Sequence, residues 1–468
     1  MYPQTYVHFH TEDAALQRLY DEAVRTCRGN LHVLGDDIVL VEGGAYQRIW
    51  VETQPMGGEM YAKHNMIAAL NNQLLFMRHQ RKDGRLPGTI GNASDGKAEP
   101  RYATLQGFCF PWPALNMYYW LGEDRDYLDL LADTLERYDA YLWSVRDSNG
   151  DGILESWCQT DTGEDFAARY GDAPFHHPQD APPQGSSIVP MASMDMMSYS
   201  YTARDTLCEI SKIRGDGNEQ KWRQAADEVA ATIREKLWDE VRGACFEKDK
   251  YGNTIDILCH NNLRCMYFGS FSQEMADRFV NEHLLNPEEF WTTLPLPSVA
   301  ANDPAFRNIN GNNWSGQCQG LTYQRAILAL ERYGYEKIVT RLGKKLFAAI
   351  IDCGYLFPQQ FDPFTGAIGF DSDKPFEDGY GPTVLSALEY IAHIWGVTMV
   401  RGQLWFSMGT AKSPYTYEQG WGGHRYRIES DGKTAVAFVD GCEKFRAECG
   451  KRVIVDQAGN ILAQREIE

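Results

Sequence analysis

The chain has 468 residues, of which 43% are hydrophobic and 23% are charged, and its mean hydropathy is −0.44. These values are typical of an ordinary globular protein and argue against a membrane protein. The net charge of −19 opposes nonspecific binding to nucleic acid, because the phosphates would be repelled. We therefore expect a neutral or cationic small molecule as the partner, and neither nucleic acid nor a membrane.

The start of the chain and its cysteines both indicate the cytoplasm. The opening residues are polar and aromatic, unlike a cleavable secretory signal. The 11 cysteines are scattered from Cys27 to Cys449 without a CxxC pair, which predicts reduced thiols rather than a disulfide framework or a structural zinc site. We expect a cytoplasmic protein without a metal or other cofactor, and the sequence leaves its oligomeric state open.

Residues 1–50 mix helical and strand-like patterns. A helix is predicted at about 12–27, and the segments LHVLG and DIVLVE that follow it are typical of short strands. We expect this first segment to close one end of the helical region that follows.

Residues 51–397 are dominated by helical periodicity. Apolar residues recur at spacings of three and four, which is the pattern of helices that each bury one face. Because no strand follows each helix, the pattern favours a toroid or bundle of antiparallel helices over a doubly wound sheet. The expected helices are 58–80, 102–121, 124–146, 193–213, 218–238, 272–284, 316–332, 335–351 and 380–396.

The pattern changes at about residue 398. Alternating runs such as QLWFSM, RYRIES, TAVAFVD and RVIVD are separated by DGK, DGC and QAGN, which are turn sequences. Residues 398–468 are therefore predicted to form a small antiparallel β domain that packs on the helical one.

The most unusual segment is DSNGDGILESWCQTDTGEDFAARY, residues 147–170, which gathers six acidic side chains in one Gly-containing loop. Such acids are either solvated or part of a site. Its first part, DSNGDG at 147–152, matches the first half of a calcium loop, but the twelfth position is Cys158 rather than Glu. This excludes an EF-hand, and we consider a turn rich in Asp and Asn the better interpretation.

Three other segments are unusually rich in polar and aromatic residues. They are GGAYQRIWVETQPMGGEM at 43–60, GNNWSGQCQGLTYQRAILALERYGY at 311–335, and FPQQFDPFTGAIGFDSDKPFEDGYGP at 357–382. Aromatic faces stack on sugar rings and the polar groups bind hydroxyls, so this composition is compatible with a sugar pocket.

Together these segments resemble the clan of inverting glycosidases that contains glycoside hydrolase families 37 and 63, the trehalases and α-glucosidases. TGEDFAARY at 162–170 is similar to an SGWDFSSRW-type motif, and NNWSGQ at 312–317 to an NYWRGP element. FDPFTG at 361–366 is similar to an ExYxPxTG element. RYGY at 332–335 and the helix start SMDMMSYSY at 193–201 are in the same register. The resemblance spans roughly residues 40–396.

The resemblance implies a fold and a reaction. The fold would be an all-α (α/α)6 toroid barrel, at 51–397, with a small C-terminal antiparallel β domain. The reaction would be inverting hydrolysis of an α-glucosidic bond in a small soluble glycoside. Such a reaction needs one protonated carboxyl to donate to the leaving oxygen and a second carboxylate to activate water, about 6.5–9.5 Å apart. Asp165 occupies the position of the general acid, and Phe166, Tyr170 and Trp157 would lower the dielectric around it.

One position departs from the family pattern. Where the resemblance places the catalytic base, this chain has Gln359, whose amide cannot take a proton from water. Glu377 or the neighbouring Asp378 could supply the base instead. The Gln could be a substitution made to trap substrate, or the protein could do something other than inverting hydrolysis.

The resemblance and the residue types also suggest side chains that would bind substrate. Glu52 matches an acid that holds a sugar hydroxyl, and Arg169 would orient a carboxylate or a hydroxyl. The candidates also have simpler interpretations. Most tryptophans are core residues, and most acids on loops are solvated. The full set of candidates is Trp50, Glu52, Gln106, Trp112, Arg169, His176, Asn312, Trp314, Gln317 and Asp378.

Two alternatives from other classes stay open. Sugar epimerases and unsaturated-uronyl hydrolases share the helical toroid, so the fold alone does not choose among these reactions. A sugar-binding protein without turnover would also explain Gln359.

Overall fold

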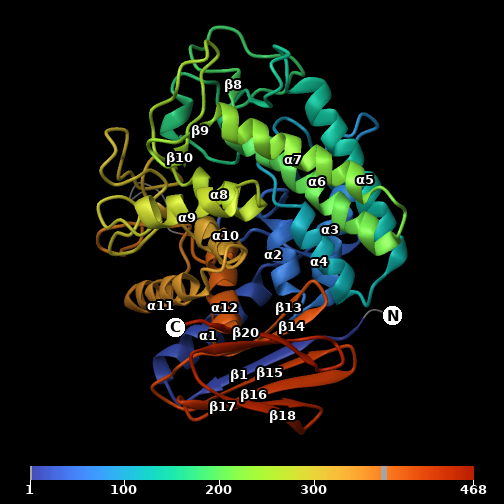
Figure 1. Ribbon diagram of the computed structural model, residues 1–468, viewed down its shortest axis with the longest axis vertical. Coiled ribbons are helices and arrows are strands. Elements are labelled where there is room, and N and C mark those ends of the chain that lie inside the picture. The colour runs from blue at the N-terminus through green and yellow to red at the C-terminus, as the bar shows by residue number, and fades with distance from the viewer. Residues whose placement is uncertain (1–2, 370–376) are drawn as a thin grey trace.

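The computed structural model describes residues 3–369 and 377–468. It consists of a helical region followed by two antiparallel sheets, which lie below the helices in Figure 1. This confirms a mostly helical chain with a C-terminal antiparallel sheet region. The α-helices of the described residues are α1 Ala14–Gly29, α2 Gln54–Tyr61, α3 Met66–Arg78, α4 Pro111–Trp120, α5 Arg125–Val145, α6 Met194–Arg214, α7 Glu219–Lys236, α8 Asn261–Phe268, α9 Gln273–Arg278, α10 Gly320–Glu331, α11 Glu336–Asp352 and α12 Gly381–Trp395.

The even-numbered helices form a closed ring. Helix α2 contacts α4, α4 contacts α6, and so on through α8 and α10 to α12, which contacts α2 again. Every residue of α2, α8 and α12 is buried, whereas α7 buries only Ala226, Val229 and Ile233. Helix α12 is apolar on almost all sides, whereas α2 and α8 also bury polar and charged side chains, and the amphipathic α7 covers the outside of the core. The amphipathic pattern therefore marks an outer helix, but an apolar pattern does not mark every inner one.

Three differences from the expected helices have local causes. The helix expected at 58–80 is two helices, because Asn65 accepts a hydrogen bond from the N–H of Ala68 and caps a new start at α3. The helix expected at 102–121 begins only at Pro111, which is favoured in the first turn of a helix and disfavoured in its interior. Helix α8 was not expected, because its residues are all buried and show no amphipathic period.

The C-terminal strands form two sheets. One has the order β13 Val397–Val400, β14 Gln403–Met408, β19 Lys451–Val455, β20 Ile461–Glu466. The other has the order β1 Tyr6–Thr11, β15 Tyr415–Trp421, β16 His424–Ser430, β17 Thr434–Val439, β18 Cys442–Glu448. Strands β13 and β14 contact β16, and α12 contacts β14, so the sheets pack on each other and on the ring.

The first 50 residues do not form one segment that closes the helical region. Strand β1 pairs antiparallel with β15 along its whole length, and Figure 1 shows it as a blue strand among the red ones. Helix α1 instead packs against α11 and α12, and the hairpin of β2 Leu31–Leu34 and β3 Asp37–Leu40 packs on α3. The expectation of a single 1–50 unit therefore did not anticipate that its first strand belongs to the C-terminal sheet.

Short strand pairs hold the loops between the helices. They are β4 Ile49–Trp50 with β5 Thr89–Asn92 and β6 Ala98–Arg101, β7 Glu155–Ser156 with β8 Met191–Ala192, β9 Trp238–Asp239 with β10 Ala244–Cys245, and β11 Cys318–Gln319 with β12 Gln360–Phe361. Single-turn 3₁₀ helices lie at Gln159–Asp161 and Ala168–Tyr170, and a π-helical turn at Phe279–Leu284 continues α9. These pairs bring distant loops to one end of the ring.

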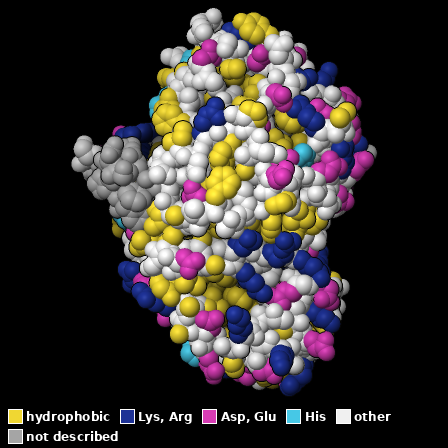
Figure 2. Space-filling view, turned by 90° about the vertical axis from the view of Figure 1, so that its left-hand side faces the viewer, with side chains coloured by type: hydrophobic (Ala, Val, Ile, Leu, Met, Phe, Trp, Pro, Cys, Tyr) yellow, Lys and Arg dark blue, Asp and Glu magenta, His cyan; other side chains and the backbone are white. Residues whose placement is uncertain are grey.

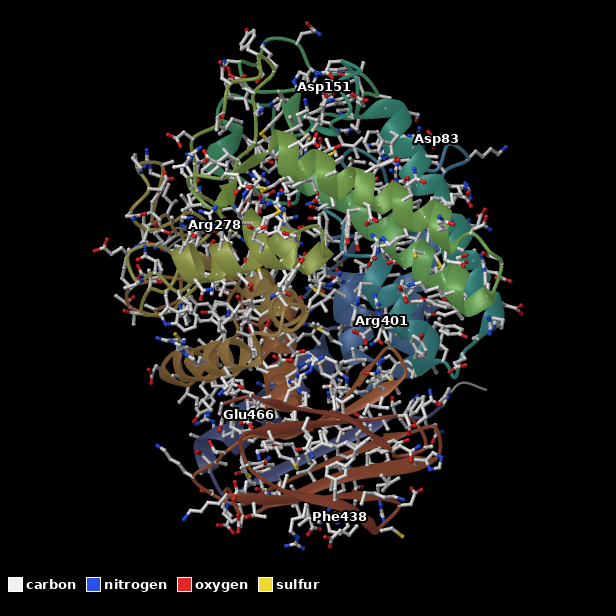
Figure 3. All side chains as sticks on the ribbon, in the orientation of Figure 1. Asp83, Asp151, Arg278, Arg401, Phe438 and Glu466 are labelled. Carbon is white, nitrogen blue, oxygen red and sulfur yellow. The ribbon has the colours of Figure 1, made fainter. Side chains whose placement is uncertain are left out.

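Side chains of the ring and of the sheets meet at the junction where Arg401 lies, and Phe438 lies on the outer sheet (Figure 3). On the face in Figure 2, Lys and Arg side chains gather near the junction between the two regions. The 11 cysteines form no disulfide within the part of the chain that the structure describes. None of the helices described is both long and apolar enough to cross a membrane.

Candidate active site

A cavity lies where inner helices begin. Glu52 lies two residues before α2, Tyr380 is the N-cap residue of α12, and the Asn312–Trp314 segment lies ahead of α10. The other lining residues come from loops held by the short strand pairs. The cavity is lined by Glu42, Tyr46, Trp50, Glu52, Gln106, Gly163, Asp165, Asn312, Trp314, Gln359 and Tyr380.

Asp165 is half-buried in the wall of this cavity. Its carboxylate accepts a hydrogen bond from Asn312 Nδ2 at 2.6 Å, and its backbone carbonyl accepts one from the N–H of Trp314 at 3.0 Å. Burial raises the pKa of Asp165 to about 6, and the Asn312 hydrogen bond offsets only part of this effect. A carboxyl with this pKa holds its proton much further toward neutral pH than an ordinary aspartate.

The apolar surroundings of Asp165 differ from those we expected. Phe166 is 55% exposed, and Tyr170 and Trp157 are buried behind the loop, where they bond to Ser156 and to Glu155. None of the three lines the cavity. The aromatic side chains that do so are Tyr46, Trp50, Trp314 and Tyr380.

Gln359 is joined to Asp165 through one intervening side chain. Its Nε2 donates to Asn312 Oδ1 at 2.7 Å, and Asn312 donates in turn to Asp165. On its other side, Gln359 Oε1 accepts a hydrogen bond from the hydroxyl of Tyr46 at 3.0 Å. Both polar atoms of the amide are therefore used, and the wall runs continuously from Asp165 to Tyr46.

Glu52 packs against the loop that carries Asp165. Its Oε1 accepts a hydrogen bond from Gln106 Nε2 at 3.3 Å, and its Oε2 lies 3.7 Å from Arg325 Nη2 with no hydrogen-bond partner. A Cβ on Gly163 would lie 1.8 Å from this Oε2, so any side chain there would displace the Glu52 carboxylate. Burial raises the pKa of Glu52 to about 8, and Arg325 and Arg264 counteract only part of the effect.

The sequence-based candidates did not include Glu42. It is 5% exposed, lines the cavity together with Tyr380, and is followed by Gly43, which is bridged to Tyr380. Burial, and then the charge of Glu52, raises the pKa of Glu42 well above its usual range. The available signal was an acid at the end of the buried strand-like run DIVLVE, directly before Gly43 and Gly44.

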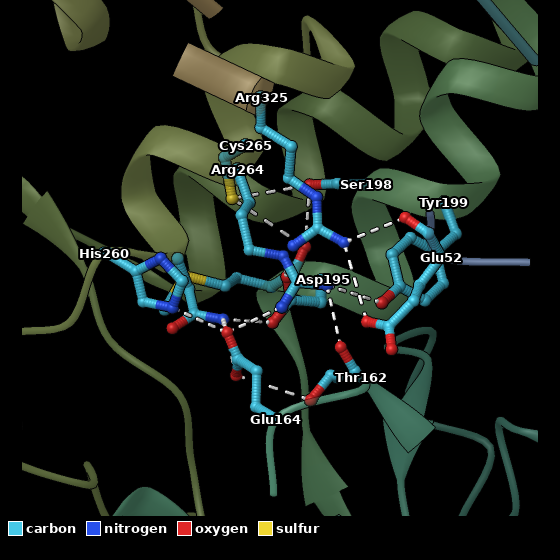
Figure 4. A network of polar contacts seen from close by, with 12 residues as sticks. Glu52, Thr162, Glu164, Asp195, Ser198, Tyr199, His260, Arg264, Cys265 and Arg325 are labelled. Atoms are coloured by element: carbon cyan, nitrogen blue, oxygen red, sulfur yellow. Dashed lines mark hydrogen bonds and ion pairs between the residues drawn. The ribbon is translucent and has the colours of Figure 1, made fainter. Parts of the chain in front are cut away.

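Arg169 does not line the cavity. Its guanidinium is 3% exposed and forms ion pairs with Glu164, Asp195 and Glu247. The carboxylates that it contacts belong to a buried network and do not line the cavity. Figure 4 shows neighbouring members of this network, with Arg264 and His260 beside Glu164 and Asp195.

Three other candidates also lie outside the cavity. Trp112 lines a different cavity, between the ring and the sheets, where the Arg401 guanidinium lies over its ring. His176 Nδ1 lies 3.0 Å from Thr160 Oγ1 beside the acidic loop. Gln317 is buried and bonds to Asn308, Asn310 and Gln360. These positions give none of them a contact with the cavity of Asp165.

Neither acid that we considered as a substitute base lines the cavity. Glu377 and Asp378 are both exposed, and Asp378 Oδ1 accepts hydrogen bonds from the N–H groups of Phe357 at 2.6 Å and Gly379 at 2.8 Å. Asp378 thus supports the turn before α12. The candidates that do line the cavity are Trp50, Glu52, Gln106, Asp165, Asn312, Trp314 and Gln359.

The DSNGDG segment forms a local turn. Asp147 and Asp151 accept hydrogen bonds from the backbone N–H groups of Gly152 and Ile153. Within residues 3–369 and 377–468, no group of three or more His, Cys, Asp and Glu side chains is arranged to hold a metal ion.

Comparison with solved structures places this fold among glycosidases. The mannosylglycerate hydrolase of Thermus thermophilus, of family 63, is 18% identical, with a TM-score of 0.63 over 79% of this chain and 99% of that one. The neutral trehalase of Saccharomyces cerevisiae is 13% identical, with a TM-score of 0.56 over 76% and 74%. A protein described as a sialidase is 14% identical, with a TM-score of 0.71 over 97% of this chain but only 42% of its own.

At these identities the likeness concerns the fold alone. The family assignment comes from the sequence: the model of the mannosylglycerate hydrolase MGH1-like glycoside hydrolase domain matches residues 66–381. The match covers more than half of the chain and includes Asp165, Asn312, Gln359 and Tyr380. The chain therefore belongs to the MGH1-like glycoside hydrolase family.

Proposed function

We propose that this protein is an inverting glycosidase that cleaves an α-glucosidic bond in a small soluble glycoside, with Asp165 as the general acid. The ring of even-numbered helices would be the inner layer of an (α/α)6 toroid, and the cavity would hold the glycone. The observation that carries the proposal is Asp165 itself, a half-buried carboxyl in a cavity wall with its pKa raised to about 6. A general acid must keep its proton near working pH and lose it in the reaction.

The composition of the cavity supports a neutral sugar. Aromatic side chains provide stacking faces, and the amides and carboxyls can bind hydroxyls. No Lys, Arg or His of the described residues lines the cavity, whereas three carboxyl groups do. An acidic glycone would meet repulsion here without a compensating cation, so we expect neutral sugars to be preferred.

The same composition bears on the alternatives. An epimerase of this fold would need histidines in the pocket, and within the described residues none lines it. His260, which belongs to the buried network, is hydrogen-bonded to Glu164. The reaction we favour is therefore hydrolysis, and binding without turnover is a defined outcome of the test below.

The test is an activity assay on a panel of α-glucosides and α-mannosides, comparing the wild type with Asp165→Asn and Gln359→Glu. We expect the wild type to hydrolyse at least one neutral member, and Asp165→Asn to lower kcat by about 10²–10⁴-fold. The loss should shrink on aryl glycosides, whose leaving groups need little protonation.

Each alternative predicts a different result. Activity that appears only in Gln359→Glu would indicate a sugar-binding protein whose base is disabled. Activity in neither protein would exclude hydrolysis of this panel. Unchanged kcat in Asp165→Asn on unactivated glycosides would remove Asp165 from the mechanism.

A further inference from the structure

The position that carries the base in related enzymes is occupied by an amide in this chain. Gln359 lies in the cavity wall, and its Oε1 and Nε2 are hydrogen-bonded to Tyr46 and Asn312. An amide has no proton-accepting group comparable to a carboxylate, so it can orient a water but cannot deprotonate it. Inverting hydrolysis would then require another carboxylate on a different wall from Asp165.

Of the other two carboxyls that line the cavity, Glu52 lies on the wall of the acid. Its carboxylate is in van der Waals range of Gly163, two residues before Asp165, and its Cβ packs against Gly107. A hydrogen bond from Gln106 and the nearby Arg325 fix it there. This position suits binding of a sugar hydroxyl next to the leaving group, and not activation of water across the ring.

Glu42 lies on the side of the cavity formed by Tyr46 and Tyr380, because the next residue, Gly43, is bridged to both. The ring of Tyr380 packs edge-on against that of Tyr46 at 6.1 Å, and Tyr46 donates to Gln359. The backbone around it is tightly fixed, because the N–H of Gly381 donates to the Glu42 carbonyl. Glu42 thus lies on the side of the cavity where Tyr46 holds Gln359, whereas Asp165 is held by Asn312.

Burying a carboxylate without a cation costs free energy, and carboxyls in such environments occur preferentially at functional sites. Glu42 is 5% exposed and no Lys or Arg of the described residues lines its cavity. The nearby acids of the buried network are all paired with guanidiniums, so the chain can neutralise carboxylates where they are structural. Glu42 has no comparable structural explanation.

We infer that Glu42 is the general base of this enzyme, replacing the acid that Gln359 cannot supply; the inference rests on the proposed inverting hydrolysis. Glu42 takes a proton from a water as the water oxygen bonds to the anomeric carbon. The bond from that carbon to the leaving oxygen breaks, and the leaving oxygen takes the proton of Asp165. The products are the free sugar and the alcohol, with Glu42 protonated and Asp165 ionised, and exchange with solvent restores both.

The electrostatics of the cavity couple the two carboxyls. Burial, and then the charges of Glu52 and Asp165, raise the pKa of Glu42 well above its usual range, and Tyr380 and Arg325 counteract only part of this effect. The active form holds one proton between Glu42 and Asp165. Only the arrangement with Asp165 protonated and Glu42 ionised is competent, so the pH profile of kcat/KM should be bell-shaped, with limits that belong to the pair rather than to either residue.

The experiment compares Glu42→Gln with Asp165→Asn on two substrates, an unactivated glucoside that the wild type cleaves and the corresponding α-glucosyl fluoride. Fluoride leaves without a proton, so it needs the base but not the acid. We expect Glu42→Gln to lose about 10²–10⁴-fold in kcat on both substrates. Asp165→Asn should lose a similar factor on the glucoside only. Azide should restore turnover of the fluoride by Glu42→Gln and form the β-glucosyl azide.

Glu52→Gln is the matched control, since it removes the other cavity carboxyl with the same isosteric change. It should raise KM more than it lowers kcat on the fluoride. Glu42→Asp, which keeps a carboxylate, should retain more activity than Glu42→Gln, and this excludes misfolding as the cause. Wild-type fluoride turnover in Glu42→Gln, or its loss only in Glu52→Gln, would overturn the inference and leave glycosidase activity intact. A wild type inactive on every substrate would overturn the proposed function itself.

Discussion

Glu164 and Asp165 are consecutive acids on one loop, and the structure gives them opposite environments. Glu164 is 1% exposed and contacts Arg169, Arg264 and His260. Burial alone would raise the pKa of Glu164, but the two guanidiniums outweigh it and hold the pKa well below its usual range. The Asp165 carboxylate accepts a hydrogen bond from the Asn312 amide and forms no ion pair with the described residues, and burial raises its pKa to about 6.

One loop thus carries both an acid that stabilises the fold and an acid that is able to donate a proton. The guanidiniums of the buried network neutralise Glu164 and Asp195 and thereby fix the loop. None of these cations lines the cavity, where an ion pair would hold Asp165 ionised and unable to donate a proton. Glu164, which stays ionised, positions Asp165. Replacing the carboxylate by an amide should therefore have different effects at the two residues.

The largest expected effect is on catalysis. Asp165→Asn should lower kcat on an unactivated glycoside by about 10²–10⁴-fold, because the leaving oxygen loses its proton donor. The free energy of unfolding at pH 7 should not fall, since the substitution removes a partly buried charge. Steady-state kinetics and urea unfolding of the same preparation measure both. A variant that loses activity only because it unfolds would break the comparison.

Glu164→Gln should act on stability instead. It removes one of the two anions that Arg169 and Arg264 share, the other being Asp195, and breaking a buried ion pair typically costs about 3–5 kcal/mol. The control is Glu443→Gln, which removes an exposed partner of Arg446 and should change the free energy of unfolding by less than about 1 kcal/mol. Equal losses in the two variants in urea unfolding would contradict the structural role of Glu164.

Gly163 tests how closely the loop packs on Glu52. Gly163 and Gly150 both have φ of +72°, but a Cβ at Gly163 would collide with the Glu52 carboxylate and one at Gly150 meets nothing. Gly150→Ala should cost about 1–2 kcal/mol of unfolding free energy through backbone strain alone. Gly163→Ala should cost about 1–3 kcal/mol more and raise KM, because it displaces Glu52. Indistinguishable variants would show that the contact is unimportant.

The smallest effect is a pH dependence of stability. The folded pKa of Asp165, about 6, lies above its unfolded value, so the unfolded state releases this proton first as pH rises. Asp165 therefore destabilises the fold increasingly between about pH 4 and pH 6, by at most about 3 kcal/mol and less because it is partly open to solvent. Urea unfolding should show Asp165→Asn gaining stability over the wild type from pH 4 to pH 7. A constant difference would contradict the raised pKa.

The sequence predicted the outer layer of the fold better than the inner one. Helix α7 was predicted because one face is apolar and the other charged, whereas α8 is buried on all sides and has no such period. Strand β1 pairs with β15 from the opposite end of the chain, and no local pattern encodes that pairing. Local periodicity reports how a segment meets solvent, and not which distant segment it meets.

The candidate site shows the same limit of local sequence patterns. Asp165, Asn312 and Gln359 were found because each lies in a recognisable short motif, and all line one cavity. Glu42 lies in no such motif. It joins the others only in the folded chain, where it lines the same cavity as Tyr380. Arg169 stands beside Asp165 in sequence, yet pairs with Glu164, Asp195 and Glu247, since spacing does not say which acid an arginine will meet.

The most direct test of the central claim is the anomeric configuration of the first product. Proton NMR of wild-type hydrolysis of an α-glucoside, recorded before mutarotation, reports whether water attacks the face opposite the leaving group. Our account predicts that β-glucose appears first and α-glucose only as mutarotation proceeds. Initial release of α-glucose would contradict inversion, and with it the assignment of Asp165 and Glu42 as acid and base.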